Sequence, residues 1–288
     1  MSDIEYRLFD PKVDYVFKIL FGDEKDKSML ISLLNAILRG KPMIKDIKLD
    51  SNELPKILKN NKTCRLDIAA TSDEGIKFDI EIQCQKTKDI INRTVYYASK
   101  LFTKDLKENE DYNNSKVISI LIFGENVTDR ESAINEGYIT LKENEKDGYE
   151  ILTDNLRIIY LELNKYKITK DNIGDKLTKW VDFLKNPIDL KIKTIEDKDI
   201  EKARKTLDYI SSSDEERLII DKIVEGRNDY YSAKNIAREE GREEGLKEGE
   251  KKGKIDIAKN MLKLNIDINI ISQSTGLTIN EINELNKK

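Results

Sequence analysis

Asp67, Glu81 and Gln83 are the residues whose types and spacing could do chemistry. Asp67 lies in an alternating run at 64–71, and Glu81 and Gln83 lie in a second run at 76–84. Because side chains of a strand alternate with period two, Glu81 and Gln83 share a face. Carboxylate oxygens are preferred ligands of Mg²⁺ and Mn²⁺. A hairpin that joins the two acids therefore predicts a divalent-cation site, and the alternative is a pair of solvated acids on an exposed face.

The turn between the two runs sets their register. Its residues Asp73-Glu74-Gly75 match a three-residue hairpin loop that ends in glycine, which accepts the left-handed conformation. Asp67 is then predicted to lie opposite Glu81, where two carboxylates at ~4.5–5.5 Å between Cβ atoms repel unless a cation lies between them. From this register we also expect Arg65 to face Gln83. Asp79 shares the Asp67 face, where a solvated strand residue is favoured over a metal ligand. On the other face, Leu66, Ile68, Ile80 and Ile82 should enter the core, and Cys64 and Cys84 should be neighbouring buried thiols.

The composition narrows the possible chemistry. The chain has 288 residues and no histidine, which excludes His-based triads and the usual Cys/His zinc sites. Its net charge of −4 supplies no global field that would attract nucleic acid, so DNA binding needs a local basic face or a bound metal. We expect a cytoplasmic protein with no membrane association, because the chain shows no apolar span and no secretory signal.

The hydrophobic pattern predicts a mixed α/β fold. Apolar residues recur at helical spacing over 11–38, with a break at Gly22, and again over 90–106. The run 117–123 is almost entirely apolar, which is typical of a strand covered on both faces. Further strands are expected at 44–49, 138–141 and 156–163, and helices from residue 173 onward.

The C-terminal part changes character. From 237 to 253, glycine recurs every fourth residue among charged residues. This repeat predicts either a helix that associates with a second copy of the chain as a homodimer, or a solvated helix or linker. Residues 255–285 resume a compact pattern of three short helices with a helix-turn-helix outline, for which packing or dimerisation is favoured over DNA reading because Glu281 and Glu284 accompany the asparagines.

Five stretches of the chain carry, in this order, a resemblance to a known family: Asp14-Tyr15-Val16-Phe17-Lys18 with Phe21-Gly22, Leu34-Asn35, Arg65-Leu66-Asp67-Ile68, Ile80-Glu81-Ile82-Gln83 and Arg93-Thr94-Val95-Tyr96-Tyr97. The chain resembles the PD-(D/E)XK nuclease superfamily and, within it, is similar to the recombination-promoting nuclease/transposase family. This implies a restriction-endonuclease-like core with a central mixed sheet flanked by helices, followed by a helical extension. The expected divisions are 1–170 for the core, 171–232 for the extension, 233–254 for the glycine repeat and 255–288 for the tail.

The resemblance implies roles for individual residues. Asp67 and Glu81 would hold Mg²⁺ or Mn²⁺ together with the backbone carbonyl of Ile82. Asp14 could reach the same metal or could simply begin a helix. The usual lysine of the superfamily is replaced here by Gln83, which can orient water but cannot act as a base. Water activation would then fall to the metal, to a second metal or to a displaced lysine, Lys18 or Lys86.

Arg93 and Tyr96 follow the hairpin on a predicted helix. They could contact a DNA phosphate, and the structural alternative is that Arg93 bridges the core and Tyr96 packs into it. The function implied is a metal-dependent DNA endonuclease linked to recombination or a mobile element. The competing hypotheses are a catalytically silent DNA-binding or assembly module of the same fold and a transposase that joins strands.

Overall fold

The apolar run 117–123 becomes the strand β6 (Val117–Phe123), which is buried along its whole length as predicted. It lies inside a six-stranded sheet of order β1-β4-β5-β6-β8-β7. Strands β5, β6 and β8 are parallel, and the remaining pairs are antiparallel. The other strands are β1 (Ile47–Asp50), β4 (Ile68–Ser72), β5 (Lys77–Gln83), β7 (Ile134–Leu141) and β8 (Glu150–Glu162).

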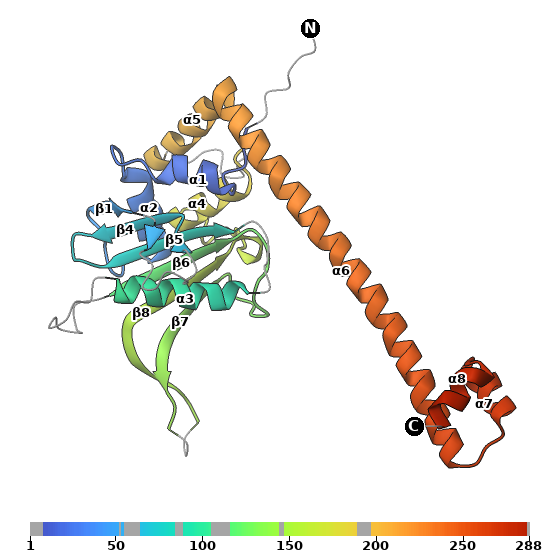
Figure 1. Cartoon of the computed structure of the whole chain (residues 1–288). Coiled ribbons are helices and arrows are strands. Elements are labelled where there is room, and N and C mark those ends of the chain that lie inside the picture. The colour runs from blue at the N-terminus through green and yellow to red at the C-terminus, as the bar shows by residue number, and fades with distance from the viewer. Residues whose placement is uncertain are drawn as a thin grey trace, which may run out of the picture. The chain divides into compact units, whose positions relative to one another are not determined.

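Helices cover both faces of this sheet (Figure 1). On one face lies α3 (Ile90–Thr103), and the other face carries α1 (Asp14–Phe21), α2 (Ser28–Ile37) and α4 (Lys176–Lys185). The predicted break at Gly22 is the end of α1. The chain is therefore a mixed α/β protein with a central mixed sheet between helices. This computed structural model describes residues 8–51, 53–54, 64–83, 89–104, 116–143, 147–188 and 197–286.

The predicted register of the hairpin is confirmed in β4 and β5. Ile68 pairs with Ile80 and Ala70 with Phe78, and Gly75 has the left-handed φ of 79° that the turn requires. Before Ile68 the prediction is wrong, because the strand does not continue. Residues Cys64–Arg65 form the separate strand β3, which pairs with β2 (Glu53–Leu54).

Two expectations about that segment fail with it. Arg65 pairs with Glu53 and Cys64 pairs with Leu54, so Arg65 does not face Gln83 and Cys64 does not continue the hairpin. The reason is a bend at Asp67, whose carboxylate takes the backbone N–H of Ile82 that a continuous strand would have bonded. Cys84 lies outside the described residues.

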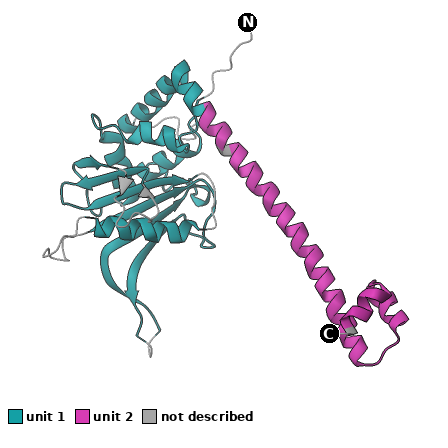
Figure 2. Ribbon diagram, in the orientation of Figure 1, with its two compact units in different colours: residues 1–220 teal, residues 221–288 magenta. Residues whose placement is uncertain are grey.

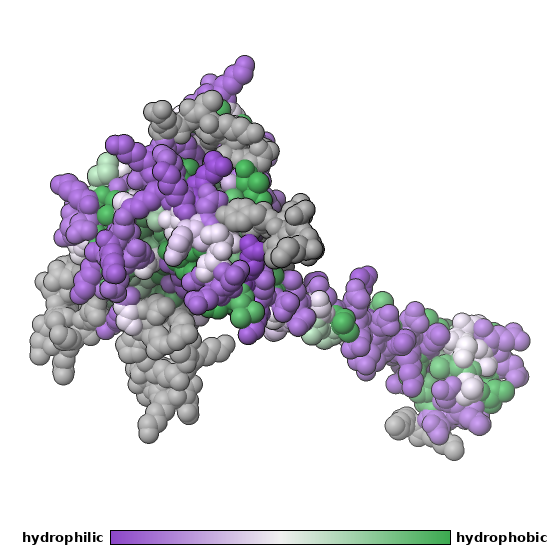
Figure 3. Space-filling view, turned by 90° about the horizontal axis from the view of Figure 1, so that it is seen from above, coloured by the Kyte–Doolittle hydropathy of each residue, from purple (hydrophilic) through white to green (hydrophobic). Residues whose placement is uncertain are grey.

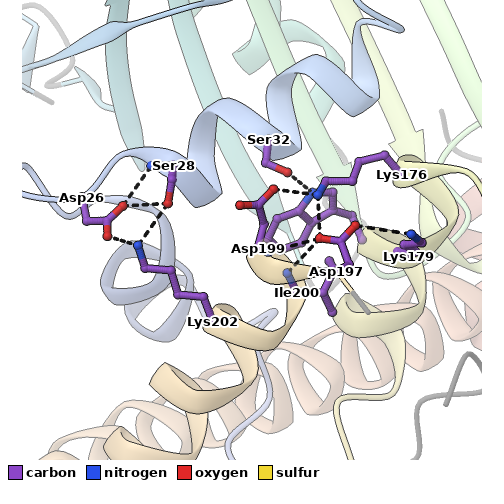
Figure 4. Close-up of polar contacts among 10 residues, drawn as sticks. Asp26, Ser28, Ser32, Lys176, Lys179, Asp197, Asp199, Ile200 and Lys202 are labelled. Carbon is purple, nitrogen blue, oxygen red and sulfur yellow. Dashed lines mark hydrogen bonds and ion pairs between the residues drawn. The ribbon is translucent and has the colours of Figure 1, made fainter. Parts of the chain in front are cut away.

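A polar network ties α5 (Lys198–Ser212) to α4 and α2 (Figure 4). The ammonium of Lys176 lies 2.6 Å from Oδ1 of Asp197 and 2.6 Å from Oδ2 of Asp199. One turn farther along α5, Lys202 pairs with Asp26 and bonds Ser28. These contacts hold the layer of helices that includes α1, and α1 supplies one side of the candidate site.

Residues 1–220 and 221–288 form two compact units (Figure 2). The helix α6 (Asp214–Lys263) includes the whole glycine repeat and is largely hydrophilic on its surface (Figure 3). Within the described residues, no helix combines the length and the apolar character that a membrane span needs. In the second unit, α6 packs with α7 (Ile268–Thr275) and α8 (Ile279–Asn286) around Ala258, Ile271, Leu277 and Ile282.

Candidate metal centre

Asp67 lies at the point where the β4–β5 ladder ends. The last ladder pair is Ile68 with Ile80, and Asp67 bends away from the position directly opposite Glu81. Its Oδ2 atom accepts a hydrogen bond of 3.1 Å from the backbone N–H of Ile82. The hairpin therefore brings the Asp67 carboxylate to the Glu81-Ile82 segment through a side-chain contact rather than through strand pairing.

The face that carries Glu81 is buried, not solvated. Glu81 is 5% exposed and Asp79 is 1% exposed. The expectation that Asp79 is a solvated residue is wrong, because β6 pairs along β5 and helices close the sheet on both faces. Asp79 Oδ2 instead accepts a hydrogen bond of 2.7 Å from the Ser119 hydroxyl of β6.

Each of the two predicted ligand carboxylates is held by one cation of the protein. The Lys18 ammonium of α1 lies 3.1 Å from Asp67 Oδ1, and the Arg93 guanidinium of α3 lies 3.3 Å from Glu81 Oε2. Asp14 is largely exposed, and its Oδ2 atom lies 3.6 Å from the same Lys18 ammonium. Helices from opposite faces of the sheet thus converge on the end of the hairpin.

Burial shifts the ionisation of these acids. It raises the pKa of Asp67, although Lys18 and the Ile82 N–H act against the rise. Burial also raises the pKa of Glu81, and the neighbouring Asp79 carboxyl raises it further while Arg93 opposes. The pKa of Asp79 is likewise raised, first by burial. The site therefore gathers negative charge that the surrounding protein only partly compensates.

The residues present fit a divalent cation. Carboxylate oxygens of Asp67 and Glu81 are hard donors of the kind that Mg²⁺ and Mn²⁺ take. Asp79 Oδ1, next to these two acids, is a buried carboxylate oxygen without a hydrogen-bond partner, so the described residues leave this acidic cluster incompletely paired. No group of three or more acidic, Cys or His side chains with metal-holding geometry occurs within the described ranges, so water and backbone oxygens would have to complete the shell.

Strand geometry fixes the direction in which the Ile82 carbonyl points. In a strand, the N–H and C=O of one residue point to the same side. The Ile82 N–H bonds Asp67, whereas the Gln83 carbonyl accepts from Gly124 on the β6 side. The Ile82 carbonyl is therefore directed toward Asp67. Gln83 itself is half-buried at the end of β5.

The remaining predicted site residues divide between the helix α3 and the undescribed part of the chain. Tyr96 is 37% exposed, with the Lys100 ammonium 5.6 Å from its ring centroid, so it does not pack into the core. Arg93 bridges to Glu81 and stacks 5.9 Å from the ring centroid of Tyr97. Lys86 lies outside the described residues.

Sequence reasoning missed the contact between Asp79 and Ser119. A signal was present, since Ser119 is the only polar residue in the apolar run 117–123. A hydroxyl inside such a strand has to find a partner, and Asp79 is its partner on the adjacent strand.

Comparison with known proteins adds one finding. A family model described as PD-(D/E)XK nuclease family transposase matches residues 11–237. That range contains Asp67 and Glu81, and the six-stranded mixed sheet flanked by helices agrees with the fold expected for such a nuclease. Neither a curated protein nor a solved structure matches the chain.

Proposed function

Because the chain belongs to the PD-(D/E)XK nuclease transposase family, we propose that it is a metal-dependent endonuclease that hydrolyses DNA phosphodiester bonds in recombination or in a mobile element. Membership in a nuclease family implies a hydrolase, and membership in a transposase family implies DNA as partner. The observation that carries the proposal is the pair of carboxylates at the end of one hairpin, of which Glu81 is buried and Asp67 is 15% exposed.

Asp67, Glu81 and the Ile82 carbonyl would hold the metal, Mg²⁺ or Mn²⁺. A bound divalent cation of this kind polarises a phosphoryl oxygen and lowers the pKa of a water. Its double positive charge would match the two single charges, of Lys18 and Arg93, that now hold the two carboxylates. Asp14 is a weaker candidate ligand because its contact is with Lys18 and its side chain is 54% exposed.

Gln83 and Lys18 would act on the attacking water. Gln83 can accept and donate hydrogen bonds and so orient a water, but it has no charge and takes no proton. Lys18 is the described lysine beside Asp67 and would supply the positive charge that the usual lysine provides. Lys86, three residues beyond Gln83, is a second candidate for that role.

Phosphate contacts would come from the helix α3. Tyr96 is exposed on it and Arg93 is one-third exposed, so both can meet a DNA backbone next to the carboxylates. With a net charge of −4, the protein has no global attraction for DNA. We therefore expect the metal and a few α3 cations to supply most of the affinity.

A plasmid-nicking assay with Mg²⁺ or Mn²⁺ tests the proposal. Asp67→Asn and Glu81→Gln should each reduce nicking by at least about 10²-fold, because each removes a charged donor with little change of shape. Asp154→Asn is the matched control, since Asp154 is a carboxylate that pairs with Lys116 away from the hairpin end. Equal nicking by the Asp67→Asn/Glu81→Gln double variant would rule the proposal out.

A catalytically silent DNA-binding or assembly module is the alternative. Two observations favour it: both carboxylates already have protein cations as partners, and Gln83 stands where a lysine is usual. The alternative predicts that calorimetry detects no Mn²⁺ binding and that the wild-type protein does not nick. Strand transfer by a transposase would give joined products in the same assay, and hydrolysis would not.

The second unit would serve assembly. An added methyl group at Gly241, Gly245, Gly249 or Gly253 would meet no atom within 4 Å, so this ridge of α6 is open toward solvent or a second copy. We retain a homodimer through the repeat as a proposal. Sedimentation equilibrium of the full chain tests it, and a monomer at tens of micromolar concentration would exclude it.

A further inference from the structure

Two buried polar atoms near Glu81 have no hydrogen-bond partner. One is a donor, Arg93 Nε, and the other is an acceptor, Asp79 Oδ1. Leaving such a group unpaired in the interior is costly, and more so when the group is charged. A donor and an acceptor left free in the same neighbourhood indicate a contact that forms in another state of the site.

Both atoms belong to side chains that neighbour the Glu81 carboxylate. Arg93 bonds Glu81 through Nη2 at 3.3 Å, and Asp79 precedes Glu81 by two residues on the same face of β5. Arg93 and Asp79 already attract one another electrostatically. Ser119 holds the Oδ2 atom of Asp79, which fixes the carboxylate and leaves Oδ1 available.

We propose that Arg93 exchanges carboxylates, pairing with Glu81 when the site lacks metal and with Asp79 Oδ1 when a divalent cation takes Glu81. This inference rests on the proposed function, since it presumes that Glu81 binds a metal. It assigns to Asp79 a positioning role that does not require contact with the metal or the DNA. It also makes Arg93 a competitor of the metal for Glu81 rather than only a phosphate ligand.

The exchange follows from the charge balance of the site. A metal that displaces Arg93 from Glu81 would strand a guanidinium that keeps its charge at any relevant pH. Asp79 Oδ1 offers that guanidinium a charge-assisted bond, which is about twice as strong as a neutral one. The Tyr97 ring, 5.9 Å from the guanidinium carbon, supports the group from its face. Asp79 should therefore strengthen metal binding, and should do so through Arg93.

The direct test follows the Arg93 Nε–H resonance of the ¹⁵N-labelled full chain during a Mg²⁺ titration. The resonance is assigned by its absence in Arg93→Lys. We expect it to move downfield as Mg²⁺ saturates, in the manner of a new hydrogen bond to a carboxylate, and we expect the shift to be lost in Asp79→Asn. A resonance that does not move in the wild-type protein, although calorimetry shows that Mg²⁺ binds, overturns the exchange.

A double-mutant cycle on Mn²⁺ affinity gives a second readout. Asp79→Asn should weaken Mn²⁺ binding on the order of tenfold when Arg93 is present and much less in the Arg93→Gln background. Arg93→Gln alone should tighten binding, because it removes the competitor, and Asp154→Asn should leave binding unchanged. If Asp79→Asn weakens Mn²⁺ binding equally in both backgrounds, Asp79 acts on the metal by direct electrostatics. That result would overturn the exchange and leave the proposed function standing. Absence of any Mn²⁺ or Mg²⁺ binding would overturn both the exchange and the proposed function.

Discussion

Arg93 Nη2 lies 3.3 Å from Glu81 Oε2, so a side chain of α3 holds a buried carboxylate that we propose as a metal ligand. Lys18 of α1 does the same for Asp67 at 3.1 Å. Asp67 and Glu81 are thus each paired with one cation from a helix on opposite faces of the sheet, and a divalent cation would compete with both pairs. This arrangement allows the metal-free protein to fold around acids that would otherwise repel.

Replacement of Lys18 separates its two proposed effects. Lys18→Gln removes a cation that competes for Asp67, so Mn²⁺ affinity measured by calorimetry should rise severalfold. If Lys18 also supplies charge beside the attacking water, plasmid nicking should fall by about 10²-fold or more at saturating metal. Lys116→Gln is the control, because Lys116 pairs with Asp154 elsewhere. Unchanged nicking at saturating Mn²⁺ would remove Lys18 from the chemistry and leave Lys86 as the candidate.

The metal-free protein should lose stability as pH rises. Burial raises the pKa of Glu81 and of Asp79 in the folded state. A carboxyl with a raised folded pKa contributes its stability below the unfolded value of about 4, and this contribution is lost as pH rises through the folded pKa. We expect the free energy of unfolding in urea with EDTA to fall by at least about 1.4 kcal/mol between pH 5 and pH 8.

No histidine contributes to the change of stability between pH 5 and pH 8, because the chain has none. Glu81→Gln should make the pH profile less steep, with the contribution of Asp79 left, and saturating Mn²⁺ should restore stability at pH 8 in the wild-type protein. A wild-type profile that is already flat over this interval would contradict the prediction.

Glu162 should stabilise the loop after β6, and this stabilisation should be lost as pH falls, in contrast to that of Glu81 and Asp79. Burial alone would raise the pKa of Glu162, but bonds from Lys165 and from the Thr128 and Val127 amides outweigh it and hold the pKa below its usual range. Glu162→Gln should lower the free energy of unfolding by about 1–3 kcal/mol at pH 7, because it removes the buried negative charge that pairs with Lys165 and accepts hydrogen bonds from the Val127 and Thr128 amides.

A depressed folded pKa contributes stability above the unfolded value of about 4, and this is lost as pH falls through the folded pKa. The difference between wild type and Glu162→Gln should therefore shrink in acid. Glu150→Gln, at an exposed residue of the same strand, is the matched control. A difference that stays constant down to pH 3 would show that the charge of Glu162 is not what matters.

The glycine ridge of α6 can be tested by adding methyl groups. Gly245→Ala with Gly249→Ala should stabilise the helix by about 1–2 kcal/mol in total, since helical glycine costs ~0.5–1 kcal/mol relative to alanine and the new groups meet no neighbour. The measurement is amide hydrogen exchange across the repeat in the full chain. If the ridge is a homodimer contact, the same variant should also dissociate more readily in sedimentation equilibrium. Reduced protection of the amides from exchange without dissociation would contradict both the solvated helix and the homodimer contact.

Local chemistry made much of the fold predictable. Strand β6 forms over the residues predicted for it, because a short run that is apolar on both faces is typical of a covered strand. The register of β4 with β5 was predictable because Gly75 allows one short loop geometry. The prediction stopped being correct at Asp67, where a side chain replaced a backbone hydrogen-bond partner.

The sequence by itself determined the turn of the hairpin and its register as far as the pair Ile68–Ile80, since turn chemistry and strand alternation act over a few residues. Only the tertiary structure decided that Asp79 is buried and that Arg93 and Lys18 hold the acids. Ser119 lies 40 residues from Asp79, and Lys18 comes from a helix on the far side of the sheet from Arg93. Burial and ion pairing depend on which distant segments of the chain cover a face of the sheet. The spacing of residues along one strand does not predict which segments those are.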